Sequence, residues 1–540
     1  MSRVVGQTSG MAIGTLLSRL TGVIRDVVLV AAIGTSVFSD AYSVANSIPN
    51  IIYILVAGGA INSIFIPTLV RRMKEDEDDG KEFADRLLTL VGGILLILVA
   101  VSMVLAPLIV RLYTTSEWDL ANLHVATVFA YWCLPQIFFY GVYTLVSQVL
   151  NARNIFVLPM FAPIVNNLIV IATAGVFMSI NHLMPTAASI TSGQLTLLGA
   201  GTTLGVILQA LLLLPALHKA GYRYRPRFDF RGAGLSKTGD MALWTIGFVA
   251  VNQISFMIIS NLTTYANALA QSNGTTAVGF TSYQKGQLMM MLPHAIITVS
   301  LITALLPRLS RHAHDGDVEA FGRQLTDTIR LIAAFIIPSA TILVLSGPSV
   351  GILLYGHGAT SGQQGSAVGF VASMFALGLP AFSIFYALLR SYYAREDTKT
   401  PFVINLVFNA LHIGIGSVLF YFFTGTFRVA SLALAYAIAY TVVCAITWKR
   451  LANSIPALKN PRHVQLIARI TFASLIGALV ASATHKLVFT SYLAPSAAGS
   501  LIRIALDVAI FGVIFLLLSI RLKLREVTSA AVLIRSRLRK

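Results

Sequence analysis

The stretch LSRLTGVIRDVVLVAAIG, residues 17–34, has the apolar content of a membrane-spanning helix, yet it carries Arg19, Arg25 and Asp26 in its middle. A helix of about 20 residues crosses a hydrocarbon core of about 30 Å. Each charge at the centre costs roughly 2.5–3.5 kcal/mol on insertion scales, so such side chains face protein or water rather than lipid. The stretch therefore predicts a membrane fold with a functional surface inside it.

Apolar stretches of similar length recur along the whole chain. Its 540 residues are 56% hydrophobic and 11% charged, and the mean hydropathy of +0.78 exceeds what a soluble core requires. We expect an all-α polytopic membrane protein with about fourteen transmembrane helices. The expected spans are residues 9–34, 41–70, 84–112, 122–149, 156–180, 192–217, 238–266, 276–306, 320–345, 364–391, 400–423, 427–450, 463–488 and 500–522. No small-residue cleavage site follows the polar start, so the first helix is expected to be retained.

The net charge of +18 is distributed as a membrane topology requires. Lys and Arg gather in alternate connections such as HKAGYRYRPRFDFRGAGLSK, whereas connections such as YGHGATSGQQG are almost free of them, with Arg428 as the clearest exception. This asymmetry predicts that both termini are cytoplasmic, and nucleic acid is not expected as a partner. Cys133 and Cys444 both fall in predicted helices, so neither a disulfide framework nor a metal site is predicted.

An internal repeat defines the expected domains. FIPTLVRR at residues 65–72 recurs as LLPRLSRH at 305–312, and LNARNIFVLPMFAPIVNNL at 150–168 parallels YAREDTKTPFVINLVFNAL at 393–411, with offsets of about 240 residues. Six helices per repeat preserve orientation, as in transporters built from parallel repeats. We expect two pseudo-symmetric six-helix lobes with the substrate path between them. The expected domains are lobes at 1–220 and 238–450, two appended helices within 463–522 and a basic cytoplasmic tail at 523–540.

The charges of the first helix fall on one broad polar face. Thr15, Arg19, Gly22 and Asp26 form one stripe, and Ser18, Thr21 and Arg25 form a second beside it. One interpretation is an Arg–Asp pair that only cements helix packing, and the other is a cationic wall of a central cavity. We favour the cavity because two arginines outnumber one aspartate. Guanidinium groups offer paired planar donors that suit phosphate, so our hypothesis is an anionic, phosphorylated substrate.

The second helix adds further polar candidates. Asp40 begins it at the outer surface, where it acts either as an N-cap or in gating. Asn50 follows Pro49, whose kink frees backbone carbonyls inside the membrane.

Polar candidates also occur in the second lobe. Asp240 opens the seventh helix, and Asn405 and Asn409 share one helix face, so these three are candidates for a coupling cation. Lys285 lies near the start of the eighth helix. It either completes a cationic cage with the first helix or extends to the membrane interface.

Five motifs together resemble the MurJ (MviN) family of peptidoglycan lipid II flippases, within the multidrug/oligosaccharidyl-lipid/polysaccharide exporter superfamily. They are LSRLTGVIRD, SDAYSVANSIPN, AGGAINSIFIPTL, LNARNIFVLPMFAPIVNN and YYAREDTKTP. The likeness covers essentially the whole chain. It implies fourteen helices in two lobes, with the helices of 463–522 lining a lipid-facing groove for a polyprenyl tail.

The resemblance also implies the site. The family's essential arginines and aspartate fall on Arg19, Arg25 and Asp40, and the aligned motifs add Ser18, Asp26 and Asn50. Two departures stand out. Where better-known members carry an Arg pair and a Glu in the second helix, this chain has Tyr53, Ile54 and Gly58. Their eighth-helix arginine has no clear counterpart, with Lys285 as the nearest cation. Substrate contacts are therefore expected to be redistributed.

The implied activity is transport of the undecaprenyl-pyrophosphate-linked disaccharide-pentapeptide from the inner to the outer leaflet of the bacterial cytoplasmic membrane by alternating access. The headgroup would cross a hydrated cleft while the isoprenes stay in lipid. No covalent step or cofactor is expected, and the energy source is either the membrane potential or a monovalent cation. Expected partners are lipid II, membrane lipids and enzymes of cell-wall synthesis, although topology alone accounts for the basic loops.

The sequence leaves three alternative functions. A polysaccharide-lipid flippase or multidrug antiporter of the same superfamily is the nearest, although an antiporter of cationic drugs would favour intramembrane carboxylates over the arginines found here. A membrane-embedded enzyme would need a general base in a structured outer loop, and those loops are short with few acids. No nucleotide-binding motif is visible. A scaffold without transport would leave the charged helix unexplained.

Overall fold

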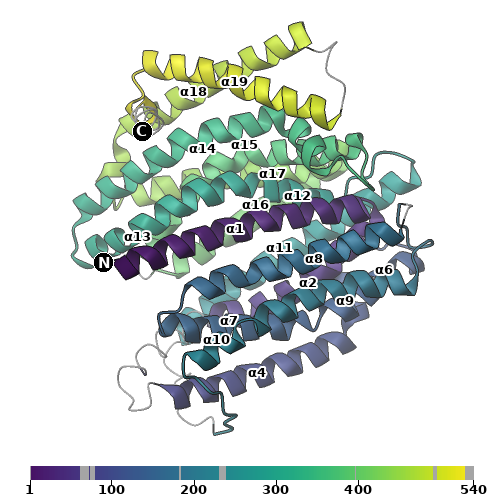
Figure 1. Cartoon of the computed structure of the whole chain (residues 1–540). Coiled ribbons are helices and arrows are strands. Elements are labelled where there is room, and N and C mark those ends of the chain that lie inside the picture. The colour runs from purple at the N-terminus through teal and green to yellow at the C-terminus, as the bar shows by residue number, and fades with distance from the viewer. Residues whose placement is uncertain are drawn as a thin grey trace. The chain divides into compact units, whose positions relative to one another are not determined.

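The computed structural model describes residues 2–60, 72, 80–181, 184–229, 239–395, 397–489 and 496–528. Within these ranges every regular element is a helix. The chain divides into two compact units, unit 1 (Met1–Gln271) and unit 2 (Ser272–Lys540), and Figure 1 labels the main helices of each. The predicted all-α class is confirmed.

The bounds of the helices follow chain order. Unit 1 holds α1 (Ser2–Ile33), α2 (Val37–Ala60), α4 (Lys81–Val104), α5 (Ala106–Tyr113), α6 (Leu120–Cys133), α7 (Gln136–Ala152), α8 (Val157–Ile180), α9 (Ser192–Leu211), α10 (Leu214–Lys219) and α11 (Gly239–Ser272). Unit 2 holds α12 (Phe280–Pro293), η3 (His294–Val299), α13 (Ser300–His314), α14 (Val318–Tyr355), α15 (Gly362–Tyr393), α16 (Lys399–Phe422), α17 (Thr426–Ala452), η4 (Pro456–Lys459), α18 (Pro461–Thr484), η5 (His485–Phe489) and α19 (Ala497–Arg521).

The expected membrane spans correspond to these helices. Twelve helical stretches from Lys81 onward are long and apolar enough to cross a membrane, counted over the described residues. α1 and α2 cover the first two expected spans but are not among these twelve, and residues 61–70 of the second expected span lie outside the described residues. The main difference in length is α14, which runs to Tyr355 although its span was expected to end at residue 345.

Proline interrupts several of the spans. α4 gives way to α5 at Leu105, where Pro107 occupies the first turn of the new helix. α6 and α7 meet at Leu134 and Pro135, and Pro215 lies in the first turn of α10. Proline lacks an N–H and clashes with the preceding turn, so each of these predicted spans consists of two helices.

α11 packs as part of unit 1. Ser260 Oγ donates to the Tyr113 carbonyl at 2.7 Å, and Asn261 Nδ2 donates to the Thr114 carbonyl at 2.6 Å. Thr264 Oγ1 accepts from the Thr115 N–H at 3.1 Å. The repeat places the same helix at the start of the second lobe, whereas these polar contacts attach it to the end of α5. The helical repeat and the compact units therefore have different boundaries.

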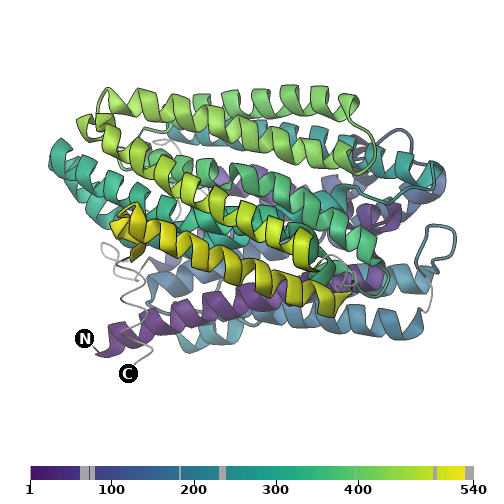
Figure 2. The same ribbon diagram turned by 90° about the horizontal axis from the view of Figure 1, so that it is seen from above.

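The appended helices α18 and α19 lie side by side and pack on α14 (Figures 1 and 2). Their apolar contact includes Ile470, Phe511 and Phe515, which are buried with Ala333 and Ile337 of α14. One buried charge also joins them, because Ser346 Oγ of α14 donates to Asp507 Oδ2 of α19 at 3.1 Å. This contact joins the first half of α19 to the second half of α14.

Candidate functional site: the charged face of α1

Asn167 of α8 holds the polar face of α1. Its Nδ2 donates to the Ser18 carbonyl at 3.1 Å and to Thr21 Oγ1 at 2.9 Å, and its Oδ1 accepts from Arg25 Nη1 at 3.1 Å. Asn167 is 4% exposed, so these bonds satisfy an amide buried between two helices. Part of the predicted polar face therefore packs against α8.

Arg25 and Asp26 form an ion pair between neighbours in sequence. Arg25 Nη2 lies 3.3 Å from Oδ1 and 3.4 Å from Oδ2 of Asp26. The Arg25 side chain is 30% exposed and that of Asp26 is 10% exposed. The guanidinium is thus oriented by two fixed partners while part of its surface stays accessible. The geometry combines helix packing with an available cationic group.

Arg19 differs from Arg25 in having no partner among the residues that the structure describes. Its side chain is exposed, and within the part of the chain that the structure describes it makes no hydrogen bond or ion pair. Apolar Leu16 and Leu20 are exposed on the same helix. Because an unpaired arginine is costly against lipid, an exposed guanidinium in a membrane helix indicates a surface that meets water or an anion.

Polar side chains continue from Arg25 into the interior of unit 1. Tyr42 of α2 and Tyr140 of α7 lie near its guanidinium. The Tyr42 hydroxyl lies 2.6 Å from Thr202 Oγ1, and the Tyr140 hydroxyl donates to Gln136 Oε1 at 3.0 Å. Gln136 is fully buried. The interior beside Arg25 is therefore a hydrogen-bonded network rather than an apolar core.

Asp40 lies in the first turn of α2 rather than at its N-cap. Its N–H donates to the Ser36 carbonyl at 3.1 Å, so Ser36 occupies the cap position and the predicted N-cap role is wrong. The Asp40 carboxylate is fully buried and accepts from Asn267 Nδ2 of α11 at 2.7 Å. Asn267 also donates to the Thr35 carbonyl at 3.2 Å. A role of Asp40 in gating stays a prediction.

We expect Asn267→Leu to destabilise the protein by roughly 1–3 kcal/mol, because the buried Asp40 carboxylate loses a donor. The measurement is thermal unfolding of the purified protein in detergent. Gln271→Leu is the matched control, since Gln271 is exposed about one turn further along α11. Equal melting temperatures for the two variants would contradict the assigned contact.

The other sequence candidates lie on other helices. Asn50 is exposed on α2, and Lys285 is half-buried on α12 of unit 2. Asn405 and Asn409 are buried on α16, where Asn409 Nδ2 donates to the Asn405 carbonyl at 2.9 Å and to its Oδ1 at 3.2 Å. The side chain of Asp240 lies outside the described residues. The structure thus brings together Ser18, Arg25 and Asp26 in unit 1, and the asparagine pair in unit 2.

Two of the departures in the second helix can be located. Tyr53 is half-buried, and the centroid of its ring lies 6.0 Å from that of the Tyr140 ring. Ile54 is half-buried, and the surroundings of Gly58 lie outside the described side chains. Tyr53 therefore makes an aromatic contact at one of the positions where this chain departs from the family pattern.

Sequence reasoning missed Asn167, Gln136 and Asn267. Each is an amide in an otherwise apolar helix, and buried amides in a membrane helix need partners inside the protein. The motif FAPIVNNL contains Asn167, so its polarity was visible, but its partner on α1 was not.

Known proteins match this chain in sequence and in fold. The family model described as lipid II flippase MurJ matches residues 29–504. A probable lipid II flippase MurJ of Haemophilus influenzae is 26% identical over 456 residues, covering 82% of this chain and 84% of that protein. The solved structure of a lipid II flippase MurJ in an inward closed conformation has a TM-score of 0.73 at 21% identity, covering 95% of this chain and 99% of that one. An inward-facing multidrug resistance MATE family transporter of the MOP superfamily has a TM-score of 0.59 at 14% identity, covering 82% and 95%.

Proposed function

Because the chain belongs to the lipid II flippase MurJ family, we propose that it moves lipid II from the inner to the outer leaflet of the bacterial cytoplasmic membrane. The cargo is the disaccharide-pentapeptide on its undecaprenyl pyrophosphate carrier. The reaction is transport by alternating access, without a covalent step. The observation that carries the proposal is the exposed, unpaired guanidinium of Arg19 on a membrane helix, beside the oriented guanidinium of Arg25.

The charged face of α1 supplies what the headgroup needs. Moving a pyrophosphate through hydrocarbon is costly because its charges lose water. Guanidinium groups replace that water with paired donors. Arg25 is held by Asn167 and Asp26, so little orientation is lost when an anion binds. Ser18, Asp40, Asn50 and Lys285 are proposed as further substrate contacts.

A headgroup drives the conformational change only if the inward-open and outward-open states bind it with different affinity. We propose that the membrane potential or a monovalent cation supplies the remaining energy. The cation candidate is the buried pair Asn405 and Asn409, together with Asp240. The alternating distribution of Lys and Arg supports cytoplasmic termini.

A second candidate function is that of a multidrug antiporter or polysaccharide-lipid flippase. The observation that favours it is the fold shared with a MATE family transporter. The arginine excess on α1 argues against cationic drugs as cargo. Native mass spectrometry with an undecaprenyl pyrophosphate lipid and a cationic drug tests the antiporter, and retention of the lipid alone argues against drugs as cargo.

The direct test is a bacterium depleted of its own flippase. We expect expression of this chain to restore lipid II to the outer leaflet, measured with a membrane-impermeant label. An Arg19→Ala variant should restore much less, since the unpaired cation is removed. Depleted cells that regain no outward lipid II when the wild-type chain is present in the membrane would overturn the proposal.

A further inference from the structure

A cavity of about 300 Å³ lies in unit 2 where the appended helices meet α14. This volume is at the lower end of the range for ligand pockets. It is formed by the first half of α18, the chain that follows α19, and α14. Its lining residues are Arg330, Arg462, Gln465, Leu466, Arg469, Lys523, Leu524, Arg525 and Glu526. We call it the basic cavity.

The basic cavity has a strong excess of positive charge, because five of its side chains are cationic and one is acidic. The one carboxylate is already engaged, since Glu526 Oε1 lies 2.6 Å from Arg330 Nη2. The side-chain charges of Arg462, Arg469, Lys523 and Arg525 have no hydrogen bond or ion pair within the described residues. Exposed cations gathered in one cavity without a described acidic partner favour the binding of an anion.

The wall formed by residues 523–528 is packed against the rest of unit 2. Leu524 is 1% exposed and Val527 is 8% exposed, and both belong to the apolar cluster on α14. The chain reaches this position by a turn in which Lys523 adopts φ 55. That backbone conformation favours glycine, so a lysine here is retained at a cost in strain. A need for the Lys523 ammonium group in the cavity would explain why a lysine occupies this strained position.

The surface next to the cavity is apolar. On α18, Phe472 and Leu475 follow Arg469 and are exposed, and on α19 Leu517 and Ile520 are exposed just before the cavity. A ligand that combines phosphate with long acyl chains fits both surfaces. Free phosphate would use only the cations. Basic cavities between membrane helices are a known mode of phospholipid headgroup binding.

We propose that the basic cavity binds the phosphate headgroup of an anionic phospholipid, with the acyl chains along the exposed face of α18 and α19. The phosphate lies among Arg462 and Arg469 of α18 and Lys523 of the turn that follows α19. This site shares no residue with the charged face of α1, and it does not depend on the proposed cargo. Its occupant ties the appended helices to α14.

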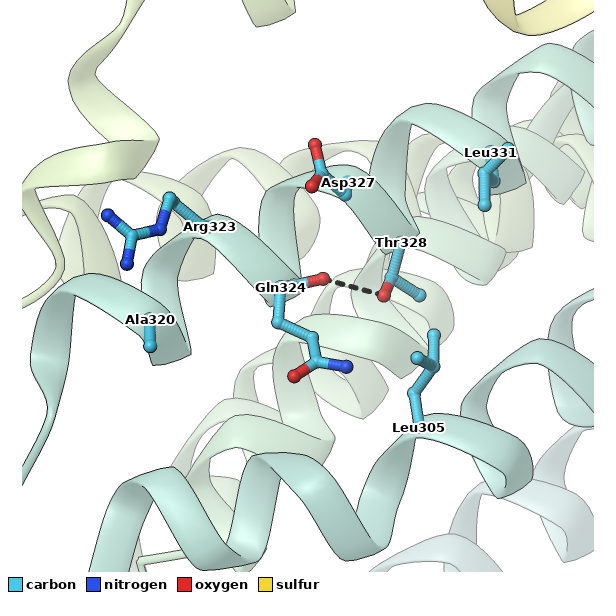
Figure 3. Close-up of a pocket in the computed structure, with 7 residues that line it drawn as sticks. All are labelled: Leu305, Ala320, Arg323, Gln324, Asp327, Thr328 and Leu331. Carbon is cyan, nitrogen blue, oxygen red and sulfur yellow. Dashed lines mark hydrogen bonds between the residues drawn. The ribbon is translucent and has the colours of Figure 1, made fainter. Parts of the chain in front are cut away.

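A second cavity of unit 2 provides a control. It measures about 320 Å³ and lies between α13 and α14, lined by residues that include Leu305, Arg323, Gln324 and Asp327 (Figure 3). Figure 3 shows Leu305 and Gln324 facing each other across it. Arg323 pairs with Glu319, so its charge is compensated. This second cavity has a similar volume and also borders α14, but it lacks the uncompensated cations of the basic cavity.

The test uses the full chain purified in a neutral detergent, titrated with phosphatidylglycerol, with phosphatidylcholine of the same acyl chains, or with inorganic phosphate. Binding is measured by native mass spectrometry and by melting temperature. We expect phosphatidylglycerol to bind at least tenfold more tightly than phosphatidylcholine. The double variant Arg462→Gln, Arg469→Gln should lose at least tenfold in that affinity, whereas Arg323→Gln should retain it.

Lys523→Gly separates binding from folding. Glycine relieves the strained φ, so the lipid-free protein should melt at a higher temperature, while its affinity for phosphatidylglycerol should fall. Three results would overturn the proposal: equal binding of the two lipids, equal loss in the double variant and in Arg323→Gln, or unchanged affinity in Lys523→Gly. A saturable shift of the same size with inorganic phosphate would replace the lipid by free phosphate and also overturn it.

Discussion

Arg25→Lys is expected to lower the delivery of lipid II to the outer leaflet by at least tenfold, while Arg19→Lys leaves delivery near the wild-type level. Arg25 uses two separate nitrogens, Nη1 toward Asn167 and Nη2 toward Asp26. A lysine ammonium is a point charge on a flexible stem and cannot reproduce that fork. A hydrogen bond involving a charged group contributes roughly 1.5–3 kcal/mol. If these bonds orient the guanidinium during transport, the loss of one of them lowers the rate of lipid II delivery by about tenfold or more.

Arg19 is the matched comparison because it lies on the same helix but has an exposed side chain without a partner in the described chain. Only its charge is needed if it meets the headgroup through water, so lysine should suffice. Outward lipid II is measured by an impermeant label in depleted cells, with membrane levels of each variant as the control. Equal activity of the two lysine variants would show that the orientation by Asn167 has no role.

The helices could be predicted because membrane spans follow from local composition. The expected span 156–180 differs from α8 by a single residue at its start, and 400–423 differs from α16 by one residue at each end. The length of an apolar stretch is enough to predict such membrane-spanning helices. The breaks at Leu105 and Leu134 were not predicted, since a proline in a long apolar stretch does not by itself say whether a helix bends or stops.

The charged face of α1 was also predictable, since Arg19, Arg25 and Asp26 stand out in an apolar stretch. The partner of Arg25 was not, because Asn167 is 142 residues away and any buried amide could have filled that place. The same holds for Asp40 and Asn267, which are 227 residues apart. Polarity shows that a side chain needs a partner, but only the packed helices show which one.

The appended helices show a different limit of prediction from sequence. Residues 500–522 were predicted as an apolar helix, and no role was predicted for the charged residues Arg503 and Asp507 within them. Asp507 is 2% exposed and bonded to Ser346 of α14. The basic loops were explained by topology alone. Topology accounts for the sign of such charges, but it does not explain why Arg462, Arg469 and Lys523 converge on one cavity.

Gly369→Ala is expected to destabilise the protein by roughly 1–3 kcal/mol, the usual cost of overpacking. Gly347 and Gly351 on α14 face Gly365 and Gly369 on α15, and both pairs have the four-residue spacing that lets membrane helices approach closely. A Cβ on Gly369 would lie 2.0 Å from the Gly347 carbonyl oxygen and 2.8 Å from the Pro348 Cα. These are backbone atoms, so the two helices themselves must separate.

The control is Gly414→Ala on α16, where an added Cβ meets nothing within 4 Å. Alanine there removes the entropic cost of glycine, which is roughly 0.5–1 kcal/mol in a helix, so this variant should be neutral or more stable. Opposite signs in the melting temperatures of the two purified variants are the expected result. Gly369→Val should destabilise the protein more than Gly369→Ala and reduce the yield of monodisperse protein in detergent. If Gly369→Ala melts at or above the wild-type temperature, α14 and α15 do not approach through these glycines.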